Sequence, residues 1–309
     1  MLMKKIKLNG LVTATHSPFK ADGTLNLAMV ERQAEHLSRQ HISTVFVCGT
    51  TGESHSLLLE EHLRLSQRWL EVTRGSRLKV IVHVGSNCLP AARELAAQAE
   101  SLGALAIAAF APCYFKPQAI EDLVRWCAEI AGAAPATPFY FYDIPALTGV
   151  SLCMRSFLEQ AADRIPTLNG LKFTNTDVMG YQQCLAANGG AFDIAWGLDE
   201  SLLAALAVGA KGAVGSTYNF AAPVYQRLIA AFEKGDLETA RLEQRRSVQL
   251  IQLLAGYGFM GAAKAVMAML GVDVGPARLP NRNPTPEQVT RLRTDLEKLG
   301  FFDWLELPK

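Results

Sequence analysis

Lys172 is the residue from which a chemical function can be argued. It stands near the middle of residues 167–177, TLNGLKFTNTD, whose short apolar run has the length of a buried strand, while the polar residues 174–177 indicate a loop and a helix cap. A lysine at the buried end of a strand is costly unless it is neutral or paired. Full burial lowers the pKa of an amine by up to ~3–5 units and so frees a nucleophile. On position alone a surface lysine is the commoner case, so the argument depends on the rest of the chain.

Polar or aromatic groups also follow other predicted strands. Residues 49–54, Gly-Thr-Thr-Gly-Glu-Ser, offer two hydroxyls and bare backbone N–H groups that suit a carboxylate, although a simple turn with a threonine cap explains them equally well. Tyr142 ends another strand, where core packing is the usual role of a tyrosine. The polar residues at 197–200 and 215–219 can also be explained as caps of the helices that follow them. Residues 111–117 form an aromatic loop that covers the barrel or makes a subunit contact. Together, around one lysine, these groups are harder to explain by capping alone.

The chemistry that fits this combination is imine formation. A neutral Lys172 attacks a ketone carbonyl and becomes a cationic Schiff base, an electron sink that permits a neighbouring C–C bond to break or form. A phenol such as that of Tyr142 can shuttle the proton, which is typically worth ~10²–10⁴-fold in rate. No pair of acids with a nearby histidine suggests a metal, and His16, His55 and His83 could at most line the mouth of the site. We therefore expect neither a metal nor an organic cofactor.

The elements that position these residues alternate regularly between strand and helix. Eight strand–helix units of this kind fill roughly 235 residues, and the strands are almost continuously apolar, as strands buried on both faces are. The predicted strands are residues 8–15, 43–49, 79–85, 104–111, 137–143, 167–173, 192–197 and 210–216. This pattern predicts a (β/α)₈ TIM barrel over residues 1–235, with its active site at the C-terminal ends of the strands. An open doubly wound sheet is the alternative, but no G-x-G-x-x-G follows the first strand.

Helical segments alone follow the barrel. They are residues 237–256, 260–271 and 286–300, and a proline-rich stretch without periodicity precedes the last of them. We expect residues 236–309 to be a C-terminal helical extension packed on the barrel, in one structural unit with it, because each helix has only a small apolar face.

Composition excludes several classes of protein. Half of the 309 residues are apolar and the formal net charge is +1, which argues against a nucleic-acid partner. No run of ~18 apolar residues suggests a membrane span, and no signal-peptide pattern opens the chain. The six cysteines are scattered without a C-x-x-C pair, so we expect reduced, mostly buried thiols and a cytoplasmic protein that acts on a small molecule.

Five motifs in order resemble the N-acetylneuraminate lyase and dihydrodipicolinate synthase superfamily, from about Gly10 to Gly300. They are G-T-T-G-E at 49–53, Y-D-I-P-A-L-T-G-V at 142–150, G-L-K-F-T at 170–174, G-L-D-E at 197–200 and G-A-V-G-S-T-Y-N at 212–219. The second and fourth motifs resemble the sialic acid lyase branch. In the synthases an arginine usually stands where this chain has Leu147, which argues against that branch.

The resemblance implies roles for individual residues. Lys172 would form the Schiff base, and Tyr142 would handle the proton at the C4 oxygen and contact the pyruvate carboxylate. Thr50 and Thr51 match the hydroxyl residues that hold this carboxylate. Four further residues match positions that bind the polyhydroxylated tail of a sugar acid: Gly197, Asp199, Glu200 and Ser216.

The resemblance also implies an assembly. Relatives are usually homotetramers, and Tyr114 matches an aromatic residue that can cross into a neighbouring subunit's site. Two departures are Thr50, where many lyases carry serine, and Asp143, where relatives have histidine or asparagine. A carboxylate at Asp143 would either oppose an anionic substrate at the mouth or pair with a nearby cation.

The expected activity is that of a class I aldolase that reversibly cleaves N-acetylneuraminate to N-acetylmannosamine and pyruvate. One alternative is an aldolase for another 2-keto acid, such as a 2-keto-3-deoxy sugar acid. The other is a non-catalytic sensor of pyruvate or a sugar acid. The presence of both Lys172 and Tyr142 counts against a sensor, because binding alone needs neither a nucleophile nor a proton shuttle.

Overall fold

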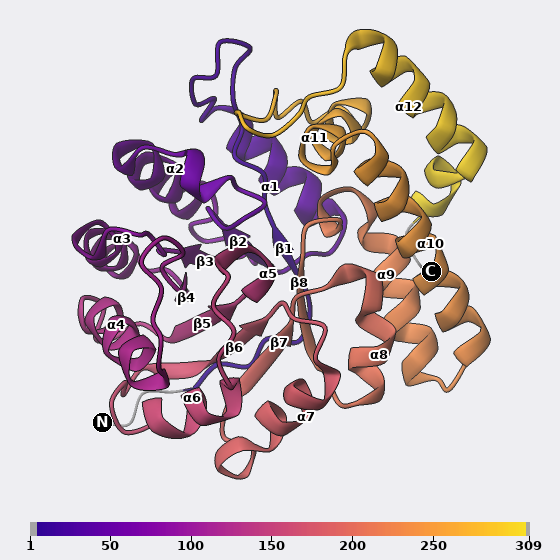
Figure 1. Cartoon of the computed structure of the whole chain (residues 1–309). Coiled ribbons are helices and arrows are strands. Elements are labelled where there is room, and N and C mark those ends of the chain that lie inside the picture. Colours follow the sequence, from indigo (N-terminus) through magenta and orange to yellow (C-terminus); the bar gives the residue numbers. More distant parts are fainter. Residues whose placement is uncertain (1–4, 307–309) are drawn as a thin grey trace.

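The computed structural model describes residues 5–306, and its centre is a closed barrel of eight parallel strands in sequence order (Figure 1). Strand β8 pairs back to β1, with Gly10 opposite Gly212 and Thr13 opposite Gly215, so no strand edge stays open. The strands are β1 (Gly10–Ala14), β2 (Thr44–Val47), β3 (Lys79–His83), β4 (Ala106–Phe110), β5 (Phe139–Asp143), β6 (Leu168–Phe173), β7 (Asp193–Trp196) and β8 (Gly212–Gly215). The predicted (β/α)₈ barrel is confirmed.

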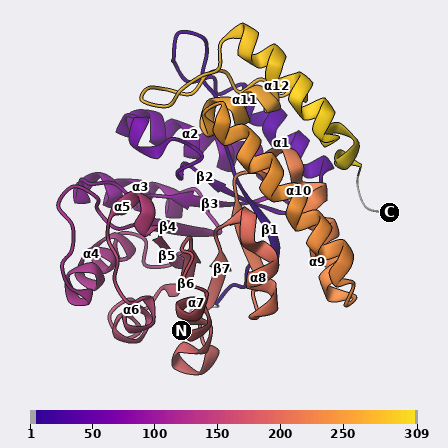
Figure 2. The same cartoon turned by 45° about the vertical axis from the view of Figure 1, so that its right-hand side comes forward.

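Helices surround the barrel, and the helices of the C-terminal extension add a further layer on one side. The helices are α1 (Met29–Arg39), α2 (Leu59–Val72), α3 (Leu89–Ser101), α4 (Ile120–Gly132), α5 (Pro145–Thr148), α6 (Met154–Ala161), α7 (Val178–Ala186), α8 (Leu202–Ala207), α9 (Tyr218–Glu233), α10 (Leu237–Gly256), α11 (Phe259–Met269) and α12 (Pro286–Leu299). The short α5 was not expected from the sequence. Figures 1 and 2 place α10, α11 and α12 together on the side of α1 and α9, and α10 packs along α9.

Two apolar clusters form the core. The larger lies between strands and helices and includes residues of α10, α11 and α12 as well as of the barrel. The smaller fills the barrel itself, and its four aromatic residues are Phe46, Phe110, Tyr140 and Tyr142. Three cysteines, Cys48, Cys127 and Cys184, are buried and all six are free, so the expectation of mostly buried thiols holds for half of them.

The N-terminal end of the barrel is closed by a buried polar network. Tyr140 Oη donates to Asp193 Oδ2 at 2.7 Å, and Asn169 Nδ2 donates to Tyr140 Oη at 2.7 Å. The backbone amides of Ile6 and Leu8 donate to Asn169 Oδ1 and Asp193 Oδ2, each at 2.9 Å. Because these groups satisfy one another, the segment before β1 seals this end and leaves the opposite end for a ligand.

Strand β6 contains one extra residue relative to β5. Phe139 pairs with Leu168 but Tyr140 pairs with Gly170, so Asn169 forms a β-bulge. Glycine is required at position 170, because a Cβ there would lie 1.7 Å from the carbonyl oxygen of Asp193. Beyond the bulge Lys172 lies opposite Tyr142, inside the barrel.

Within residues 5–306 no single helix is long and apolar enough to span a membrane. Helices α10 and α11 meet the length and composition criteria only as a pair bent by 111°.

Candidate active site

A cavity of about 260 Å³ lies at the C-terminal ends of the strands. Eight of the residues singled out from the sequence line it together: Thr50, Thr51, Tyr142, Lys172, Gly197, Asp199, Glu200 and Ser216. They come from five strands or the loops after them, and the parallel barrel brings these ends to one mouth. Tyr114 is the predicted residue that does not line this cavity.

Lys172 brings an amine into the cavity from the penultimate position of β6. The residue is 5% exposed, and its register partners are Tyr142 in β5 and Ala195 in β7. The Nζ atom lies 3.9 Å from the centre of the Tyr142 ring and 4.5 Å from the centre of the Phe46 ring. Across residues 5–306 no carboxylate lies within 4.0 Å of this amine and no hydrogen bond engages it. The amine is therefore buried, held by aromatic rings and available to a carbonyl group.

Tyr142 joins the lysine to the turn after β2. Its hydroxyl lies 3.2 Å from Thr50 Oγ1, where either oxygen can be the donor. Its ring packs edge-on against Phe46 and His83, with centroid distances of 5.8 and 6.0 Å, which fixes the direction of the phenol. The phenol is thus placed between the amine and a threonine hydroxyl.

The turn after β2 places two residues with free backbone amides, Thr50 and Thr51, in the lining of the same cavity. Glu53 N donates to Thr50 O at 2.9 Å, and Ser54 N donates to Gly49 O at 3.1 Å. The amides of Thr50 and Thr51 make no hydrogen bond to any group of residues 5–306. Free N–H groups on successive residues of a turn form a concave site for an anion.

The opposite wall of the cavity is acidic. Asp199 is 5% exposed, and its Oδ2 accepts hydrogen bonds from Thr217 N at 2.9 Å and Thr217 Oγ1 at 2.6 Å. Its Oδ1 is buried without a hydrogen-bond donor in the described part of the chain. Burial raises the pKa of Asp199 to about 6, and the bonds from Thr217 counteract this effect. Glycine at position 215 makes room for the carboxylate, since a Cβ there would lie 1.8 Å from Oδ1.

Several lining residues escaped the sequence reasoning. Thr174 Oγ1 is buried without a hydrogen-bond partner in residues 5–306, and Gly197 approaches it so closely that a Cβ would lie 1.9 Å away. The position of Thr174 directly after β6 is a sequence signal for a lining residue, although its polar neighbours also fit a loop and a helix cap. Ile251 in α10 and Phe259 in α11 also line the cavity, and no local sequence pattern indicates that they do.

The histidines lie outside this cavity. His16 and His83 are fully buried, and burial holds the pKa of His16 at about 3 and that of His83 well below its ordinary value. His55 lines a neighbouring pocket of about 190 Å³, which shares Thr50 and Ile144 with the cavity. Within residues 5–306 no group of three or more histidine, cysteine or acidic residues is arranged to hold a metal ion.

Asp143 does not act at the mouth. Because side chains alternate along β5, it points away from the barrel interior that Tyr142 faces, and it is 3% exposed. Asn175 Nδ2 donates to its Oδ2 at 3.3 Å, and no cation of the described chain pairs with it. Burial raises its pKa to about 7. Both suggested roles, opposition to an anionic substrate and pairing with a cation, are wrong for this structure.

Tyr114 lies in the loop between β4 and α4, away from the cavity. It is 78% exposed and its neighbour Phe115 is 86% exposed, and the two rings pack edge to face with centroids 4.9 Å apart. Two large exposed aromatic rings side by side are typical of an interaction surface.

Comparisons with known proteins give a consistent result. Residues 7–299 match the model of the dihydrodipicolinate synthetase family. The chain is 38% identical to the N-acetylneuraminate lyase of Gallus gallus over 96% of this chain and 98% of the relative. It resembles the solved structure of the Aliivibrio salmonicida N-acetylneuraminate lyase with a TM-score of 0.93 and 40% identity, over 98% of this chain and 99% of that one. A dihydrodipicolinate synthase from Bacillus anthracis has a TM-score of 0.87 and 28% identity, over 94% of this chain and 98% of that one.

Proposed function

The chain belongs to the dihydrodipicolinate synthetase family, and we propose that it is a class I aldolase that reversibly cleaves N-acetylneuraminate to N-acetylmannosamine and pyruvate. The observation that carries this proposal is the buried, unpaired amine of Lys172 beside the phenol of Tyr142. The relatives named N-acetylneuraminate lyase, which align over nearly the whole chain, support the choice of substrate.

The reaction begins at the amine of Lys172. Its nitrogen bonds to the ketone carbon of the open-chain sugar acid, the carbonyl oxygen leaves as water, and a protonated imine results. The C3–C4 bond then breaks, and its electron pair moves toward the imine nitrogen to give an enamine. The C4 hydroxyl loses its proton and becomes the aldehyde of N-acetylmannosamine. Protonation of C3 and hydrolysis of the imine release pyruvate and restore the amine.

Tyr142 and the turn after β2 take the other two roles. The phenol relays the proton of the C4 hydroxyl, since its oxygen takes up that proton as it gives its own proton to the substrate carboxylate, and its 3.2 Å contact with Thr50 Oγ1 keeps it oriented for that transfer. The free amides of Thr50 and Thr51 receive the substrate carboxylate, which fixes the ketone carbon next to Lys172.

The acidic wall receives the hydroxylated tail. The unpartnered Oδ1 of Asp199 is an acceptor for a sugar hydroxyl, and Glu200, Ser216 and the backbone at Gly197 complete the same wall. A tail with several hydroxyl groups satisfies the buried oxygen of Asp199 and the more exposed acceptors beside it, whereas an apolar tail leaves the buried oxygen unpaired. The named relatives do not favour a 2-keto-3-deoxy sugar acid or a sensor role.

The assembly and location follow as further parts of this proposal. We propose a homotetramer in which the exposed Tyr114 reaches a neighbouring subunit, and one structural unit formed by residues 1–235 and 236–309. The expected cytoplasmic location stays a prediction. Size-exclusion chromatography of a Tyr114→Ser variant tests the assembly, because retention of the native size would show that this ring is dispensable for it.

Pyruvate release from N-acetylneuraminate by the purified protein tests the reaction. Lys172→Ala should abolish release and leave the barrel folded, whereas Lys79→Ala, which changes an exposed lysine at the opposite end of a strand, should leave release intact. Substantial cleavage by the Lys172→Ala variant would refute the assignment. Tyr142→Phe should lower kcat far more than it weakens pyruvate binding, since the phenol acts in the proton transfer.

A further inference from the structure

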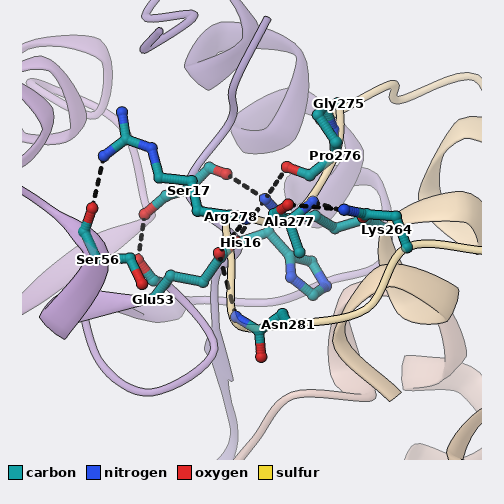
Figure 3. Close-up of polar contacts among 12 residues, drawn as sticks. His16, Ser17, Glu53, Ser56, Lys264, Gly275, Pro276, Ala277, Arg278 and Asn281 are labelled. Carbon is teal, nitrogen blue, oxygen red and sulfur yellow. Dashed lines mark hydrogen bonds and ion pairs between the residues drawn. The ribbon is translucent and has the colours of Figure 1, made fainter. Parts of the chain in front are cut away.

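A fully buried ion pair lies beside the turn that carries Thr50 and Thr51. Lys264 Nζ of α11 lies 2.6 Å from Glu53 Oε1, and each side chain is only 1% exposed. The ammonium also donates to the carbonyl oxygens of Ser17 and Pro276, each at 2.9 Å (Figure 3). Two hydrogen bonds and one ion pair therefore hold the Lys264 ammonium in one position.

The second oxygen of Glu53 ties the same turn to the chain after α11. The backbone amide of Arg278 donates to Glu53 Oε2 at 2.8 Å, and Asn281 Nδ2 lies 3.4 Å from the same oxygen. The guanidinium of Arg278 makes a separate set of contacts, with Glu61 at 2.6 Å and with the carbonyl oxygen of Ser56 at 2.6 Å. The C-terminal extension thus reaches the turn through the Glu53 carboxylate.

The backbone of Glu53 is in a conformation that needs such support. Its φ of 54° is left-handed, which is uncommon for a residue other than glycine and persists where the surroundings determine it. Its amide donates to Thr50 O, so the orientation of Glu53 sets the orientation of the Thr50–Thr51 peptide. That peptide carries the free amide of Thr51, and the Gly49–Thr50 peptide, whose carbonyl oxygen accepts from Ser54 N, carries the free amide of Thr50. Both residues line the catalytic cavity.

We propose that Glu53 and Lys264 are positioning residues for the carboxylate-binding turn. Lys264 fixes the Glu53 side chain, and Glu53 in turn holds the amides of Thr50 and Thr51 toward the substrate carboxylate. Neither residue lines the catalytic cavity, so both act through the turn. The inference rests on the proposed function, because it takes the pyruvate carboxylate as the ligand of the turn.

The burial of the pair argues for this role over simple packing. Across the ion pairs of residues 5–306, it alone has both side chains exposed by 1% or less. A buried ion pair is costly to desolvate, and well-packed apolar residues usually serve stability as well or better. What an ion pair adds is a defined geometry, and the group whose geometry it defines here is a strained residue of the anion-binding turn.

Borohydride trapping of pyruvate on Lys172 tests the proposal, with pyruvamide as a neutral probe of the same ketone. In Lys264→Met the pyruvate concentration for half-maximal trapping should rise about 10- to 100-fold, and that for pyruvamide by less than about threefold, because a misplaced turn weakens only the carboxylate contact. The Glu53→Gln/Lys264→Met double variant should behave alike. The double variant leaves no uncompensated buried charge. If the single variant does not fold, the preference for pyruvate over pyruvamide is therefore measured in the double variant.

Arg278→Met is the matched control. It removes the guanidinium contacts to Glu61 and Ser56 but keeps the backbone amide that binds Glu53, so the preference for pyruvate over pyruvamide should not change. An unchanged preference in the Lys264→Met and double variants, or an equal loss in the control, would overturn the inference while the proposed function stands. Absence of trapping by the unaltered protein would overturn both.

Discussion

Asp199→Asn should make the protein more stable at neutral pH and a poorer catalyst. The carboxylate is buried, its Oδ2 accepts two hydrogen bonds from Thr217, and its Oδ1 has no donor in the described chain. Asparagine keeps an oxygen for Thr217 and replaces the unpartnered oxygen by an NH₂ group beside Gly215. The substitution therefore removes a buried negative charge without removing the bonds that hold the side chain.

The magnitude follows from the pKa of Asp199, which burial raises from 3.8 to about 6. Two pKa units correspond to about 3 kcal/mol. The unfolded chain ionises this carboxyl more readily than the folded chain, so stability is lost as the pH rises from about 4 to about 6 and stays lost above that. Asparagine lacks this penalty. The advantage of the variant should be about 3 kcal/mol near pH 8 and about 1 kcal/mol near pH 4.5.

Urea unfolding of both proteins at the two pH values measures this difference. Any effect of the new NH₂ group that does not depend on pH cancels when the two pH values are compared. Equal differences at both pH values would refute the reasoning that the folded protein holds Asp199 against its ionisation. A larger stability advantage of the variant at the lower pH would show that the pKa of Asp199 is lowered and not raised by folding.

Activity should move in the opposite direction. If Oδ1 accepts a hydroxyl of the sugar tail, its loss should lower kcat/KM for N-acetylneuraminate by about 10- to 100-fold, the worth of a hydrogen bond to a charged group. Borohydride trapping of pyruvate should stay unchanged, since pyruvate has no tail. A loss of trapping equal to the loss of cleavage would place Asp199 at the ketone and not at the tail.

Three further substitutions test the barrel beneath the site. Tyr140→Phe should destabilise the protein by about 1–3 kcal/mol in urea unfolding, because it removes one of the two donors to Asp193 Oδ2 and the acceptor of Asn169 Nδ2, and KM should not change. Gly170→Ala should cost at least ~1–3 kcal/mol, because its Cβ would lie 1.7 Å from a backbone oxygen that cannot move away; native stability would refute the bulge geometry. In Asp143→Asn the loss of stability between about pH 4 and pH 7 should shrink, because burial raises the pKa of Asp143 to about 7, and an unchanged pH profile would contradict that.

The location of the site could be predicted from the sequence for a geometric reason. In a closed parallel barrel all strands end at one mouth, so polar residues directly after strands converge, whatever the details of packing. This argument needs only strand boundaries, and it brought Lys172, Tyr142 and Asp199 into one cavity. Asp143 could have been placed by the same means, because the alternation of side chains along a strand puts it on the face opposite to Tyr142.

Other features depend on contacts between distant segments. Ile251 and Phe259 reach the cavity because α10 and α11 fold back beside the barrel, and nothing within either helix indicates the direction of that packing. The Glu53–Lys264 pair joins residues more than two hundred positions apart, and each residue alone resembles an ordinary exposed charge in the sequence. Such contacts follow from tertiary packing, which overrides local pattern.

The direction of Lys172 itself depends on a feature that no single strand reveals. A strict two-residue alternation would put Leu168 on the face of Lys172, inside the barrel, yet Leu168 packs in the outer cluster. The bulge at Asn169 resolves the conflict. One extra residue shifts the alternation by one position, so that the side chain of Leu168 before the bulge and that of Lys172 after it point to opposite faces of the strand. The same asparagine bonds Tyr140 and the backbone of Ile6 at the closed end of the barrel. One irregularity in β6 therefore both fills the closed end and permits the lysine to point into the open end, which is why register, a property of two strands, decides the chemistry here.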